Sequence, residues 1–100
     1  MTVTKKLDAD TMTIFVEGWL DTLTSEQFHA EVQELGGAKN VILDLGGVDY
    51  ISSAGLREVV ALHRSVKSGG GSFSARGVVP AVMDVFTLTG FDKKLDITPA

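Results

Sequence analysis

The sequence contains no cysteine and only two prolines, and each shortage removes a class of protein. Without cysteine, a disulfide-stapled secreted scaffold and a cysteine-based zinc finger are excluded. Two prolines argue against a proline-rich linker. Apolar runs such as residues 41–43 are too short to span a bilayer, and no apolar stretch follows the N-terminal lysines as it would in a signal peptide. We therefore expect a soluble, cytoplasmic protein that does not insert into a membrane.

Basic residues are scarce relative to acidic ones. Nine lysines and arginines against thirteen aspartates and glutamates give a formal net charge of −4, which disfavours general nucleic-acid binding. Because His29 and His63 are the only histidines and cysteine is absent, we expect no metal site and no cofactor. The length of 100 residues, with 44% hydrophobic and 22% charged residues, is typical of one globular domain over residues 1–100.

Strand-like and helix-like patterns alternate along the chain. Period-two alternation predicts an opening hairpin, and later segments with 3.6-residue spacing predict three helices between further strands. This order predicts an α/β fold, a single domain in which a mixed, mostly parallel β-sheet is packed with helices. The expected strands are residues 2–7, 11–17, 41–45, 72–76 and 95–97, and the expected helices begin near residues 25, 53 and 80, the second of them ending near residue 67.

Several local patterns give sharper expectations. Thr24 and Gln27 have the spacing of a capping box at the start of the first helix, which Gly36-Gly37 should end. Residues 41–45 are almost continuously apolar, which predicts a central strand buried on both faces. Phe15 breaks the alternation of its own strand, which also indicates partial cover of the second face. We expect a loop at Gly46-Gly47 after the central strand.

Ser52 and Ser53 lie where the central strand passes into the second helix. A helix N-terminus exposes unpaired backbone N–H groups and a partial positive charge, so it stabilises an anion such as phosphate. The small residues Ala54 and Gly55 leave the backbone there open to approach. If Ser52 caps the helix, the hydroxyl of Ser53 is free, and if Ser53 caps it, the assignment reverses. The simplest alternative is that both serines only cap the helix.

Three segments, in this order, resemble the STAS domain of bacterial anti-sigma-factor antagonists. Together they cover nearly the whole chain, and the middle segment is the most specific. The segments are residues 18–21, residues 41–45 running into 48–57, and residues 77–82 with Phe86 and Gly90 behind them.

This resemblance implies a protein that binds a kinase-type anti-sigma factor and is phosphorylated by it, with a serine phosphatase reversing the modification. The family pattern, aligned on Gly55-Leu56, places the phosphorylated position at Ser53, with Ser52 as the second choice. Ser52 replaces the usual aspartate, and Ala54 replaces the second hydroxyl. The residues expected to contact the partner are Trp19, Asp21, Ser52, Ala54, Gly55 and Arg57.

Three of the polar or aromatic residues keep two interpretations each. Asp21 matches an acidic residue near the phosphorylation site of the family, where it would repel phosphate, but it is equally a loop aspartate that caps the first helix. Trp19 replaces an acidic residue of the family, and it either anchors a partner or packs under the hairpin. His63 lies within the apolar arc of its helix, and we expect a half-buried, hydrogen-bonded histidine rather than a ligand.

An enzyme is not expected. A triad of Ser53, His63 and Asp21 fails because His63 lies almost three turns along the same helix, roughly 15 Å from Ser53. The Gly-x-Ser-x-Gly pattern is absent, and the glycines at residues 69–71 lack the spacing of a phosphate-binding loop. Because STAS-like domains also serve in membrane transport complexes, the alternative function is a constitutive accessory subunit of a lipid-transport ATPase. A small-ligand pocket beside the helix N-terminus is a third possibility.

Overall fold

A mixed five-stranded sheet forms the centre of the computed structural model, which describes residues 1–100. The elements are β1 (Thr2–Asp8), β2 (Thr11–Leu20), α1 (Ser25–Gln33), β3 (Asn40–Ile51), α2 (Ser53–Ser68), β4 (Phe73–Val78), α3 (Pro80–Thr89), the 3₁₀ helix η1 (Phe91–Lys93) and β5 (Ile97–Pro99). The strand order is β1-β2-β3-β4-β5, in which β1 runs antiparallel to β2 and all other neighbours are parallel. The predicted α/β class, mixed sheet and element order are confirmed.

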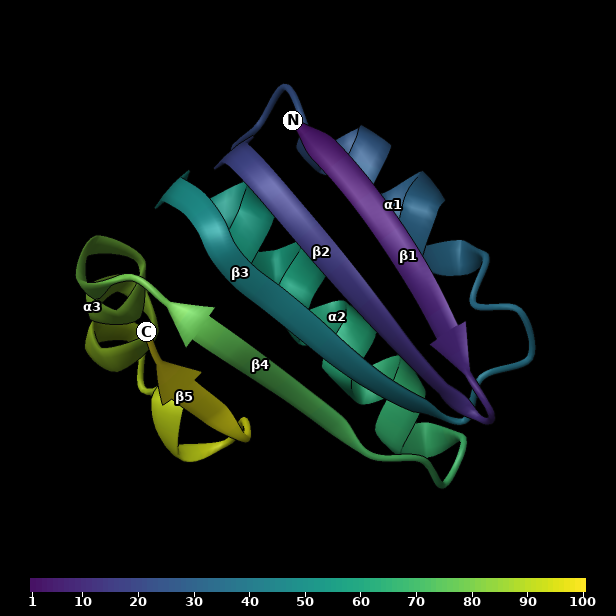
Figure 1. Ribbon diagram of the computed structural model, residues 1–100. Helices are drawn as coiled ribbons and strands as arrows, with labels where there is room; N and C mark the ends of the chain where they lie inside the picture. Colours follow the sequence, from purple (N-terminus) through teal and green to yellow (C-terminus); the bar gives the residue numbers. More distant parts are fainter.

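The apolar core lies between the sheet and the helices. Figure 1 shows α1 and α2 behind the sheet, and α3 beside the ends of β3 and β4. Ile14 of β2 and Leu43 of β3 are fully buried, as are Phe28 of α1 and Val59 of α2. The alternation along β2 therefore directs one set of side chains toward the helices, as its period of two predicts.

The other face of the sheet is more open than the sequence pattern indicated. No helix covers β1, β2 and β3 on the face turned toward the viewer in Figure 1. Phe15 keeps 38% of its surface exposed, and Ile42 and Asp44 of β3 are only half-buried. β3 is the central strand, but the prediction that it is buried on both faces is wrong. The apolar, partly β-branched sequence of β3 is explained by burial on one face and by the position of the strand between β2 and β4.

Gly46-Gly47 does not form the expected loop. β3 continues through both glycines to Ile51, with a bulge opposite β2. From Phe15 to Glu17, β2 advances two residues, while the paired residues of β3 advance three. A Cβ atom on Gly47 would lie 2.6 Å from Glu17 Cγ, so glycine permits the close approach at the bulge. The longer strand leaves only one residue, Ser52, between Ile51 and the start of the second helix.

The expected capping box at the start of α1 is wrong. Thr24 has helical backbone angles, and its side chain makes no capping hydrogen bond to the helix. Its hydroxyl instead donates to the carbonyl oxygen of Trp19 at 2.8 Å, while Gln27 donates to the carbonyl oxygen of Met1 at 3.3 Å. A turn over residues 22–24 therefore precedes α1, because the carboxylate of Asp21 organises the chain there.

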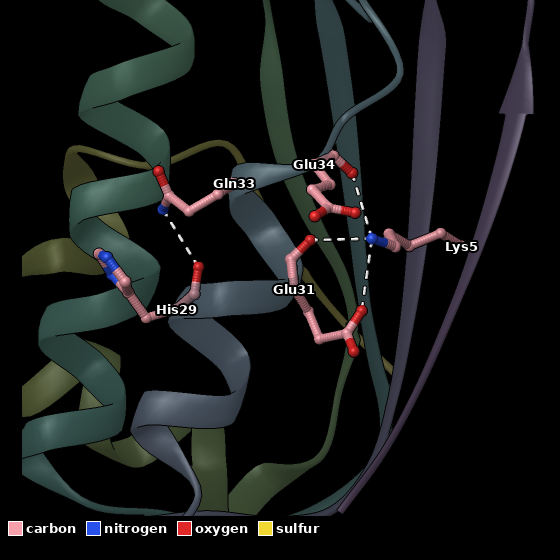
Figure 2. Close-up of polar contacts among 5 residues, drawn as sticks. All are labelled: Lys5, His29, Glu31, Gln33 and Glu34. Carbon is pink, nitrogen blue, oxygen red and sulfur yellow. Dashed lines mark hydrogen bonds and ion pairs between the residues drawn. The ribbon is translucent and has the colours of Figure 1, made fainter.

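Lys5 of β1 stabilises the opposite end of α1, as Figure 2 shows. Its ammonium donates to the carbonyl oxygens of Glu31 at 3.0 Å and Glu34 at 3.2 Å, and it pairs with the Glu31 carboxylate at 3.3 Å. Cations at a helix C-terminus satisfy unpaired carbonyls and interact favourably with the helix dipole. α1 has no basic residue in its own last turn and ends before the glycine pair expected to stop it, so β1 provides the missing cation.

The last part of the chain follows the expected turn chemistry. Pro80 opens α3, and Gly90 ends it in the left-handed conformation with a φ of 80°. Val82 and Phe86 are buried. None of the helices is both long enough and apolar enough to cross a membrane.

Candidate functional site

Ser52 forms the single-residue link between β3 and α2. Its backbone is extended, with φ −91° and ψ 174°, and its Oγ accepts a hydrogen bond from the N–H of Gly55 at 3.2 Å. Its carbonyl accepts from the N–H of Leu56 at 2.8 Å, and its own N–H donates to the carbonyl of Leu20 at 2.9 Å. Ser52 is therefore the N-cap of α2, with its hydroxyl engaged by the backbone.

Ser53 is the first residue of α2, and it is exposed. Because Ser52 caps the helix, the Ser53 hydroxyl is not needed for capping and makes no hydrogen bond within the chain. Its position also lies next to the first N–H groups of the helix, which lack partners in the preceding turn. Of the two arrangements open from the sequence, the structure thus has the one in which the Ser53 hydroxyl is free.

Gly55 holds the start of α2 against the end of β2. It is buried, and a Cβ atom there would press into the carbonyl oxygen of Leu20 and lie 2.9 Å from Leu20 Cγ and 3.0 Å from Ile51 Cγ1. Only glycine allows this approach without displacement of the backbone. Gly55 was expected to contact a partner, but its burial assigns it to packing inside the chain.

Asp21 organises the turn at the end of β2. Its Oδ1 accepts hydrogen bonds from the N–H groups of Leu23 and Thr24, each at 3.0 Å. The Thr24 N–H is the main reason that the pKa of this carboxyl lies below its ordinary value of 3.8. The pairing of Leu20 with Ile51 brings the Asp21 turn to the same edge of the sheet as Ser52. Asp21 thus holds the turn that precedes α1, but it does not cap the helix itself, because the N–H groups that it binds belong to residues before Ser25.

Trp19 lies on the surface and does not pack under the hairpin. It pairs in register with Tyr50 of β3, and the two rings are tilted by 54° with centroids 5.6 Å apart. Trp19 is 59% exposed and Tyr50 is 49% exposed. Sequence reasoning missed Tyr50, because its pairing with Trp19 depends on two register shifts between β2 and β3 that the sequence does not reveal. The two rings form an exposed aromatic pair near the start of α2.

The other expected residues lie along α2. Ala54 is half-buried in its first turn, and Arg57 is exposed one turn after Ser53. His63 is half-buried with its ring edge-on to Phe73 at 5.5 Å, but its Nδ1 has no hydrogen-bond partner, so the expected hydrogen-bonded histidine is wrong. Burial is the main cause that lowers the pKa of His63.

Neither of the two surface grooves reaches the serine pair. One lies between α1 and α2, near the 2.8 Å contact of His29 with Glu58, and the other runs along α2 beside Phe91. Neither groove is lined by Ser52 or Ser53, so the small-ligand pocket considered beside the helix N-terminus does not coincide with either groove. No three metal-ligating side chains come together. The arrangement presents an exposed serine hydroxyl and an exposed aromatic pair at the same end of the sheet, which suits contact with another protein.

Known proteins share both the sequence pattern and this fold. A protein of Bordetella bronchiseptica named anti-sigma factor antagonist BtrV is 37% identical over 78 residues, which are 76% of this chain and 67% of that protein. A solved structure from Thermotoga maritima, titled as an anti-sigma factor antagonist, has a TM-score of 0.90 at 24% identity and covers 98% of this chain and 86% of that one. Phosphorylated SpoIIAA of Bacillus has a TM-score of 0.78 at 19% identity, covering 99% of this chain and 91% of that one.

The two structural matches show the fold, and the family assignment comes from the sequence. The family model described as "Mlab, STAS domain" matches residues 3–99, which is nearly the whole chain. The chain therefore belongs to the STAS domain family.

Proposed function

We propose that this chain is an anti-sigma factor antagonist that acts as a phosphorylation-switched binding module and catalyses no reaction itself. Unphosphorylated, it binds a kinase-type anti-sigma factor, and phosphorylated on Ser53, it releases that partner. Membership of the STAS family and the 37% identity to a protein named as such an antagonist support this assignment. The kinase partner provides ATP and magnesium, and a serine phosphatase restores the free hydroxyl.

The observation that carries the proposal is the different use of the two adjacent serines. Ser52 uses its hydroxyl to cap α2, whereas Ser53 presents an exposed hydroxyl at the first helical position. Phosphate there would add about 1.5 to 2 negative charges at neutral pH. The helix N-terminus favours negative charge, so the modified domain should keep its fold. The charge change would then act on the partner and not on the folding of this chain.

Binding and release would use the surface around Ser53. Trp19 and Tyr50 form an exposed aromatic pair, the kind of side chain that often dominates the energy of a protein interface. Asp21 already places a carboxylate at the same edge of the sheet. A phosphate on Ser53 would add further negative charge to this edge, and like charges brought together across an interface cost several kcal/mol wherever the partner presents an acidic group there. The partner would therefore leave once Ser53 is modified.

The test is retention and release of the partner with and without ATP. The chain is immobilised, the partner is captured from the native host and identified by mass spectrometry, and ATP with magnesium is then added. We expect the wild type to release a kinase-type partner and Ser53→Ala to retain it. Ser65→Ala is the matched control, because it removes another exposed serine of α2 and should release like the wild type.

Two results would contradict the proposal. Release of the partner from Ser53→Ala on addition of ATP would show that Ser53 is not the switch. Capture of a transport ATPase that stays bound whether or not ATP is present would instead support the accessory-subunit function. Ser53→Asp should weaken binding only in part, because aspartate carries one charge and fewer acceptor oxygens than phosphate.

A further inference from the structure

A second groove, the α2 groove, runs along the exposed side of α2 toward η1. It has a volume of about 370 Å³. Its lining residues are Leu56, Arg57, Val60, Ala61, Arg64 and Phe91. Four of these six are apolar, and the two polar ones are both arginines. The groove is thus an apolar strip with a cation toward each end.

Neither arginine is neutralised by this chain. The ion pairs in the structure are Lys5 with Glu31 and His29 with Glu58, so Arg57 and Arg64 have no carboxylate partner. No acidic residue lines the groove, and the ammonium of Lys94 lies 5.7 Å above the ring of Phe91. The groove is therefore locally positive on a chain whose formal net charge is −4. Such an uncompensated site attracts a negatively charged ligand.

The spacing of the two arginines indicates the shape of that ligand. Arg57 and Arg64 are seven residues apart on one helix, which is two turns and roughly 10.5 Å. Val60 and Ala61 lie between them, and Phe91 faces them from η1. A second helix with two acidic residues two turns apart, and apolar side chains between them, has the complementary pattern. Helices of this kind commonly bind in apolar grooves, and arginine binds carboxylates through paired hydrogen bonds.

We propose that the α2 groove docks an acidic amphipathic helix of the protein partner. The identity of that partner rests on the proposed function, whereas the chemistry of the groove does not. The groove also connects to the switch, because Arg57 follows Ser53 by four residues and the two side chains are neighbours on the helix surface. A phosphate on Ser53 would compete with the partner's carboxylate for Arg57. Modification would then remove one docking charge in addition to repelling the partner.

The test uses a peptide, so that it needs neither the partner nor phosphorylation. The probe is a fluorescent alanine- and leucine-based helix with two glutamates seven positions apart, compared with the same helix carrying lysines. Binding is measured by fluorescence anisotropy, and its location by shifts of the backbone amide resonances. We expect the glutamate peptide to bind, with shifts centred on Val60, Ala61 and Phe91, and the lysine peptide not to bind.

Charge reversal within α2 supplies the matched comparison. Arg64→Glu should weaken binding of the glutamate peptide by about tenfold or more, as the loss of a charge-assisted hydrogen bond requires. Lys67→Glu makes the same charge change at an exposed position outside the groove and should leave the affinity within about twofold.

Three outcomes would overturn the groove proposal. They are no binding of the glutamate peptide, equal losses for Arg64→Glu and Lys67→Glu, and resonance shifts that lie away from the groove. The proposed function is tested separately with the whole partner. If Arg64→Glu binds and releases the partner like the wild type, the groove proposal fails and the switch at Ser53 stands. If the glutamate peptide binds but no kinase-type partner responds to ATP, the proposed function fails and the groove remains.

Discussion

Replacing Gly55 by alanine would place a methyl group against the backbone of β2. The added Cβ would press into the carbonyl oxygen of Leu20 and lie 2.9 Å from its Cγ, closer than real Cβ atoms approach other heavy atoms. That carbonyl cannot rotate away freely, since it accepts the N–H of Ser52 at 2.9 Å. The start of α2 would have to move outward, which would also strain the link between β3 and the helix.

The expected cost follows from two opposing effects. Overpacking of a close contact typically costs about 1–3 kcal/mol, while alanine regains up to about 1 kcal/mol of helix preference over glycine. Because the added Cβ meets a backbone oxygen and not the end of a flexible side chain, the overpacking cost should lie in the upper part of this range, at about 2–3 kcal/mol, and the net loss in the free energy of unfolding should be about 1–2 kcal/mol. For a domain of this size, each kcal/mol lowers the melting temperature by about 4–8 °C. Gly55→Ala should therefore melt roughly 5–15 °C below the wild type.

The assay is thermal unfolding followed by circular dichroism at neutral pH, with Gly69→Ala as the control. Gly69 ends the same helix, its φ is −80°, and the nearest atom to an added Cβ lies at 3.6 Å. Its replacement should change stability by less than about 0.5 kcal/mol. Equal melting temperatures for Gly55→Ala and Gly69→Ala would refute the argument that the helix approaches β2 too closely for a side chain.

Four further substitutions separate the roles of the site residues. Ser52→Ala should lose about 1 kcal/mol of unfolding free energy in urea titrations through loss of the N-cap, whereas Ser53→Ala should lose almost nothing. The lowered pKa of Asp21 stabilises the fold above pH 3.8, and this contribution is lost as the pH falls through the lower pKa of the folded state. Asp21→Asn should therefore make the free energy of unfolding depend less on pH in this acidic range. The lowered pKa of His63 makes stability fall as pH drops below 6.5, and NMR titration of its ring should give a midpoint below that value. Trp19→Ala should weaken partner binding by about 2 kcal/mol or more without a matching loss of stability, and an unchanged affinity would exclude it as an anchor.

The periodic patterns were sufficient to predict the order and pairing class of the elements. Period-two alternation predicts β2, and 3.6-residue spacing predicts α2. Pro80, which favours a helix start, and Gly90, which favours a helix end, predict the bounds of α3. These signals are strong because one face of each element packs against the same core. The family resemblance was also available from the sequence, and the match over residues 3–99 confirms it.

Features that depend on neighbouring strands were not predictable in the same way. A glycine pair has the same local signature in a loop and in a bulge, and only the approach of Glu17 to Gly47 shows which is present. Likewise, threonine is a residue type common at N-caps, but the Thr24 side chain makes no capping hydrogen bond, and the Asp21 carboxylate binds the backbone of the preceding turn. The half-open sheet face around Phe15 could not be foreseen, since apolar β-branched runs occur in strands with one or two covered faces.

The sequence draws attention to the serine pair at the start of α2, but it does not determine which of the two hydroxyls caps the helix. Adjacent serines are both acceptable N-caps, and the choice depends on whether β3 ends at Ile51 or one residue later. The bulged β3 ends at Ile51, which makes Ser52 the cap and leaves Ser53 exposed. The pairing of Trp19 with Tyr50 depends on the same register, because each extra residue in β3 changes which β3 side chain lies beside Trp19.

The most direct test of the account is the intact mass of the protein purified from its own host, followed by fragment mapping of any modified peptide. We expect a phosphoryl-sized increment that maps to Ser53 and disappears in Ser53→Ala. Phosphate on Ser52 would contradict the division of roles between the two hydroxyls. The absence of any increment across several growth conditions would contradict the switch itself and favour a constitutive subunit.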